Sequence, residues 1–140
     1  MTQPLLLFFV CIVCFFVARA YFGYQFVYQV GYGAFSFLAA TIALTFLWLW
    51  LKRSTPLALG MAFGWCGAAS VMAWWWLFNL LDRPEEMVEN SALFLFLSVY
   101  FVGAILHLEV IGRSFGISRR LAMLPVAMAL FLSVLVATVF

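Results

Sequence analysis

Long apolar runs separated by short polar turns are the feature that most restricts how this chain can fold. Each run has about 20 mostly apolar residues, the length that an α-helix needs to cross a bilayer core of about 30 Å. The runs are continuous rather than alternating, which favours helices over the strands of a membrane barrel. We therefore predict an all-α integral membrane protein with a single domain over residues 1–140. Its bundle of five transmembrane helices is expected at about residues 5–22, 34–51, 56–81, 91–111 and 121–140.

Composition excludes the other broad classes of protein. Hydrophobic residues make up 69% of the chain and charged residues only 9%, whereas a soluble domain is about half apolar and about a quarter charged. So few charged side chains cannot cover the surface of a soluble globule. The net charge of +2 is too small to indicate a nucleic-acid partner. We therefore expect the lipid bilayer to surround the chain, with no nucleic acid bound.

The distribution of Lys and Arg predicts how the bundle is oriented. With five spans, the N-terminus and the connections after the second and fourth spans share one side of the membrane. Because basic residues favour the cytoplasmic side, we expect the N-terminus to be cytoplasmic and the C-terminus outside, in a bacterial inner membrane or an equivalent one. The expected inner side holds Lys52, Arg53, Arg113, Arg119 and Arg120, and the outer side holds only Arg19 and Arg83.

The first apolar run also has the form of a signal peptide. Residues 5–17 are followed by Ala18-Arg19-Ala20, a small-residue pattern typical of cleavage sites. No Lys or Arg precedes the apolar core, however, whereas signal peptides begin with a basic segment. We therefore expect an uncleaved first helix.

The acidic turn at residues 82–89 is expected on the outer side. Asp82 followed by Glu85 resembles a capping box, which predicts that the fourth helix begins near Arg83. Arg19 lies on the same side and is expected to pair with Glu85 or Glu86. The alternative is that the acidic turn meets a basic patch on a partner.

Tyrosine and tryptophan gather near the expected ends of the spans. Their amphipathic rings settle at the level of lipid headgroups, so we interpret them as an interfacial aromatic belt. The tyrosines recur at three- and four-residue steps, and an alternative is a docking surface for a partner, a lipid tail or a quinone. The belt residues are Tyr21, Tyr24, Tyr28, Tyr32, Trp48, Trp50, Trp74, Trp75 and Trp76.

His107 is the single histidine of the chain and lies near the inner end of the fourth span. An ionisable group within a span is a functional hypothesis, so one interpretation is a redox or haem-binding membrane anchor subunit with His107 as a ligand. Haem would need a second ligand. The simpler interpretation is a hydrogen bond from His107 to a carbonyl or a neighbouring helix, with Glu109 and Arg113 paired one turn apart.

Cys11, Cys14 and Cys66 fall within apolar runs. At the expected depths all three could meet near the middle of the bilayer, where thiolates bind copper(I) or zinc. The alternative is that each is a small buried apolar residue. We expect no bound cofactor, with haem and a metal ion as the alternatives.

Small residues at four-residue spacing form the most regular pattern. Such residues let two helix backbones approach closely within lipid. We therefore expect another helix, from this chain or a second subunit, to lie in the groove of the third span, and Gly64→Ile to push the two backbones apart. The helix-packing residues are Gly60, Gly64 and Ala68 on the third span and Ala129, Ser133 and Ala137 on the fifth.

No catalytic arrangement of side chains is recognisable, so we do not expect an enzyme. The combination of packing faces without catalytic residues favours a non-catalytic multi-pass subunit of a larger membrane complex or homo-oligomer. Its partners would be other membrane subunits or a second copy of the chain. The alternative is a small transporter or channel, for which the spans offer hydroxyl groups, Asn79 and His107.

Overall fold

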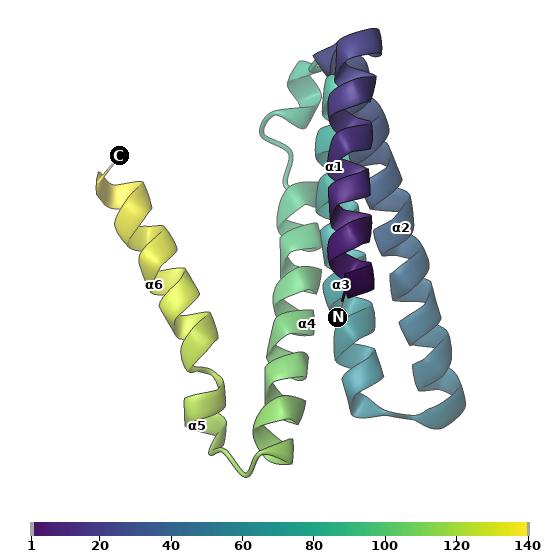
Figure 1. Cartoon of the computed structure of the whole chain (residues 1–140). Helices are drawn as coiled ribbons and strands as arrows, with labels where there is room; N and C mark the ends of the chain where they lie inside the picture. Colours follow the sequence, from purple (N-terminus) through teal and green to yellow (C-terminus); the bar gives the residue numbers. More distant parts are fainter. Residues whose placement is uncertain (1, 140) are drawn as a thin grey trace.

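The computed structural model describes residues 2–139 as helices joined by short turns (Figure 1). No strand occurs within that range. Four helices, α1 to α4, are long and apolar enough to cross a membrane, which confirms the all-helical, membrane-compatible class. The elements are α1 (Thr2–Phe22), α2 (Tyr24–Arg53), α3 (Pro56–Leu80), the 3₁₀ helix η1 (Glu85–Met87), α4 (Ala92–Ser114), α5 (Arg119–Ala122) and α6 (Leu124–Val139).

The C-terminal apolar segment differs from the other four. A turn at Met123 divides it into α5 and α6. Pro125 lies two residues later and has no backbone N–H, so it cannot donate a helical hydrogen bond back to α5. The 16 residues of α6 span about 24 Å, less than the ~30 Å thickness of a bilayer core. Membrane crossing by a fifth helix therefore stays a prediction.

The connection between α1 and α2 is shorter than the link expected over residues 23–33. It consists of Gly23 alone, whose φ of +81° suits glycine. The tyrosine segment is instead the first part of α2, where the helical spacing stacks neighbouring rings. The ring centroids of Tyr24 and Tyr28 lie 6.0 Å apart, and those of Tyr28 and Tyr32 lie 4.3 Å apart.

The capping box predicted at Asp82 and Glu85 is wrong. Asp82 and Arg83 have φ values of 56° and 61°, and two successive left-handed residues cannot form the first turn of a right-handed helix. Helix α4 begins at Ala92 instead. The side-chain oxygen of Asn90 accepts a hydrogen bond from the backbone N–H of Ala92 at 2.9 Å, which satisfies one of the unpaired N–H groups at this end.

Helices α2, α3 and α4 form the core of the fold, with α3 packed against both neighbours. Every buried residue within the described range is glycine, alanine or serine, as for Ala39 on α2, Ala62 on α3 and Gly103 on α4. Large apolar side chains point outward, as expected where lipid rather than water surrounds the helices. Helix α1 lies along α2, and α6 diverges from α4 (Figure 1).

Candidate functional site

Glycines form a close contact between the backbones of α3 and α4. A Cβ atom added to Gly67 would lie 2.5 Å from the backbone nitrogen of Tyr100, and one added to Gly60 would lie 2.9 Å from that of His107. A Cβ atom on Gly103 would overlap the backbone of Gly64. This approach of the two backbones therefore depends on the missing side chains.

Of the packing residues predicted on α3, Gly60 faces the backbone of α4, whereas Gly64 and Ala68 differ from what the four-residue spacing suggested. A Cβ atom on Gly64 would have no atom within 4 Å, and Ala68 lines an open cavity beside the contact. A side chain at Gly103 would therefore separate the backbones, whereas one at Gly64 would meet open space. The predicted packing residues did not include Gly67 or Gly103. For Gly103, the sequence offered one indication, which is that it is a lone glycine in the middle of the fourth apolar run.

The cavity beside this contact has a volume of about 500 Å³. Met61 and His107 both line it, from α3 and α4. The Nδ1 atom of His107 is buried and has no hydrogen-bond partner within residues 2–139, which costs free energy. The structure thus places a thioether and an imidazole, which together can ligate haem iron, around one cavity.

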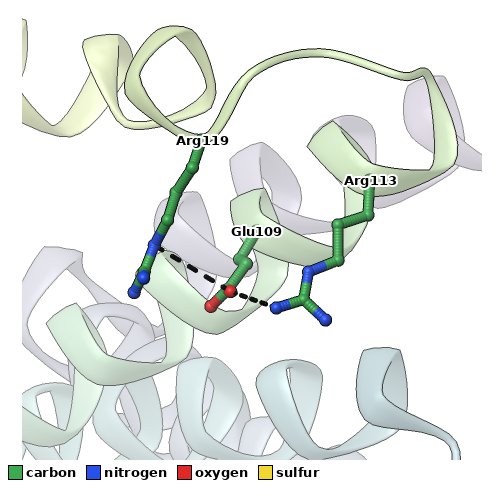
Figure 2. A network of polar contacts seen from close by, with 3 residues as sticks. All are labelled: Glu109, Arg113 and Arg119. Carbon is green, nitrogen blue, oxygen red and sulfur yellow. Dashed lines mark hydrogen bonds and ion pairs between the residues drawn. The ribbon is translucent and has the colours of Figure 1, made fainter.

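Glu109 joins the end of α4 to α5 (Figure 2). Its Oε1 atom accepts a hydrogen bond from Nη2 of Arg113 at 2.7 Å and lies 4.0 Å from Nε of Arg119. The pairing of Glu109 with Arg113 predicted from their spacing is confirmed. A Cβ atom on Gly112 would lie 2.7 Å from that of Ala122, so α5 also packs closely on α4.

Helix α6 has no buried residue, and the contacts that hold it are with α5. Ala129, Ser133 and Ala137 are all exposed. Ser133 and Ala137 line a shallow groove together with Leu132 and Val136. The hydroxyl of Ser133 donates to the carbonyl of Ala129 at 2.8 Å, so it is satisfied within its own helix. The packing face predicted on this segment is therefore open in the described part of the chain.

A second cleft separates α1 from the first turns of α2 and has a volume of about 430 Å³. The guanidinium carbon of Arg19 lies 5.8 Å from the ring centre of Tyr24. The expected ion pair of Arg19 with Glu85 or Glu86 is not found, since both salt bridges within residues 2–139 involve Glu109. The cleft is lined by Phe15, Phe16, Arg19, Tyr24, Val27, Tyr28, Gly31 and Tyr32.

The three consecutive tryptophans of α3 point in different directions. Trp74 packs on Phe96 of α4, with ring centroids 5.9 Å apart. Trp76 packs on α2, where it would contact a Cβ atom on Gly33 at 2.9 Å. Trp75 is exposed. Of these three belt residues, Trp75 is therefore the one free to meet a headgroup region. Of the remaining belt residues, Tyr21, Tyr24 and Trp48 are exposed and Tyr28, Tyr32 and Trp50 are half-buried.

The cysteines lie on separate parts of the fold. Cys11 and Cys14 are exposed on α1, which packs along α2. Cys66 is exposed on α3 and lines an apolar groove with Ala43 of α2 and Val99 of α4. Within residues 2–139, no group of three or more His, Cys, Asp or Glu residues could hold a metal ion.

Side-chain polar groups of the spans are mostly engaged by their own helices. Ser36, Thr41, Thr45, Ser70, Ser98 and Ser133 each donate to the carbonyl four residues earlier. The amide of Asn79 donates to the carbonyl of Trp75 at 2.8 Å. Because these donors are used locally, they give no support to a polar path for a transported solute.

No known protein family, characterised protein or solved structure is detectably similar to this chain. The functional interpretation therefore depends on the side chains and packing described above.

Proposed function

We propose that this protein is a non-catalytic membrane subunit that assembles with a second copy of itself through α6. The exposure of α6 supports this proposal most directly, because every residue from Leu124 to Val139 is exposed except Val126, which is half-buried. Because α6 packs mainly on the short helix α5, its own chain leaves the apolar surface of α6 uncovered. Its run of small residues is suited to close contact with another helix.

The geometry at the base of α6 favours a partner from outside the chain. Glu109 is paired with Arg113 and lies near Arg119, and Gly112 packs on Ala122. These contacts hold α5 against α4, and α6 then leaves α4 at an angle (Figure 1). A second copy presents the same groove, so two α6 helices can meet across a two-fold axis with identical faces.

Native mass spectrometry in a mild detergent tests this function. We expect the mass of a homodimer, with the monomer increasing as the protein is diluted. A monomer at every concentration would contradict self-assembly. A stable complex with a different protein, without self-association, would point to the broader alternative of a subunit in a larger complex.

We further propose that the chain lies in a bacterial-type inner membrane with five spans, the N-terminus cytoplasmic and the C-terminus outside. The excess of basic residues after the second and fourth spans supports this orientation. Reporter fusions after residues 54, 88 and 117 measure it. We expect cytoplasmic signals at 54 and 117 and an outside signal at 88, and the reverse pattern would overturn the orientation.

Binding of a redox cofactor or haem at His107 is a second candidate function. It is favoured by the imidazole of His107 and the thioether of Met61, which line one cavity from two helices. We expect protein purified with added haem to show a visible absorption band that His107→Ala abolishes and Met61→Leu shifts. Met128→Leu, on the exposed surface of α6, is the matched control for the loss of a thioether and should leave the band unchanged. A spectrum identical to that of free haem would reject this candidate.

A further inference from the structure

We propose that the cleft between α1 and α2 binds one anionic phospholipid. The two helices meet through Gly23, and a cleft of about 430 Å³ lies between them. Phe15 stands over Gly31, with a ring carbon 3.5 Å from the position of a Cβ atom on that glycine. The cleft is therefore apolar at one end, where its floor is formed by these two residues.

The other end of the cleft carries the polar groups. Arg19 lies in the last turn of α1 and forms no salt bridge within residues 2–139. Its described partner is the ring of Tyr24, which attracts the cation without neutralising it. Tyr28 adds a phenol group to the same lining.

This arrangement matches the chemistry of a phosphate attached to an acyl chain. A guanidinium offers several donors in a planar fork suited to phosphate oxygens. An inorganic anion would leave the apolar floor at Phe15 and Gly31 unfilled. An acyl chain fills it, so a phospholipid satisfies both ends of the cleft.

Helix α1 makes few contacts with the rest of the described chain. None of the 18 residues in its most apolar window is buried, and its described contacts are chiefly with α2. A lipid seated between the two helices would add contacts to both. We therefore expect the bound lipid to stabilise the attachment of α1 to α2.

Native mass spectrometry of the delipidated chain tests this site, with phosphatidylglycerol and phosphatidylcholine as probes. We expect one phosphatidylglycerol to be retained at least about tenfold more strongly than phosphatidylcholine, because only the former leaves a net negative charge for Arg19. Arg19→Gln should abolish this preference, and Arg19→Lys should retain part of it. Arg53→Gln, an exposed cation at the opposite end of α2, is the matched control and should change nothing.

A second variant tests the apolar end without touching the charge. Gly31→Leu should fill the cleft and reduce phosphatidylglycerol retention, while circular dichroism shows unchanged helix content. Equal retention of both lipids, or no effect of Arg19→Gln, would overturn the proposal in favour of ordinary surrounding lipid. If inorganic phosphate fully displaced the lipid, the cleft would be a simple anion site. That result would also overturn the proposal.

Discussion

Gly103→Ala is expected to separate α3 from α4 and to lower the stability of the fold. A single methyl group at this position would overlap the backbone of Gly64, and a helix backbone cannot move aside as a flexible side chain can. Overpacking of this kind typically costs about 1–3 kcal/mol. The measurement is the thermal unfolding midpoint in mild detergent, which we expect to fall by several degrees relative to the unmodified chain.

Gly64→Ala is the matched control for this prediction. It adds the same methyl group across the same contact, but there the new atom would have nothing within 4 Å. Alanine also favours a helix over glycine by about 0.8–1 kcal/mol in water. We therefore expect Gly64→Ala to be neutral or stabilising. Equal losses of stability in the two variants would mean that the α3–α4 contact differs from the one described.

The class of the protein and the positions of its long helices could be predicted from the sequence, because apolar run length is set by membrane thickness. Four of the predicted spans correspond to helices long enough to cross a membrane. The link over residues 23–33 is harder to interpret, since its glycines and tyrosines indicate a turn as readily as a helix. In the structure it is the first part of α2, with the rings of Tyr28 and Tyr32 next to one another along the helix.

Which helices pack against one another, and through which residues, could not be predicted from the spacing of small and apolar residues. A helix that is apolar on all sides has no polar face to mark what is exposed, so packing depends on where backbones can approach. That depends on pairs of positions on different helices, such as Gly64 and Gly103, which no single run reveals. The shared cavity of Met61 and His107 follows from the same contact.

Ala129→Ile is expected to dissociate the proposed homodimer. The residue begins the small-residue run on α6, where two backbones would approach across the two-fold axis. A branched side chain there would hold the helices apart, at a cost of about 1–3 kcal/mol, and each ~1.4 kcal/mol weakens association about tenfold. Native mass spectrometry over a dilution series measures the change, and the unfolding midpoint of the monomer should stay the same.

Ala127→Ile is the control that distinguishes an interface from a general effect of size. Ala127 is also exposed on α6, and two residues of helix turn it about 200° away from Ala129. A larger apolar side chain on that side meets lipid, which accommodates it, so the dimer should persist. If both variants remain dimeric, α6 is not the contact between copies. If both dissociate, the association does not depend on the small-residue face, and the proposed two-fold packing of α6 is wrong.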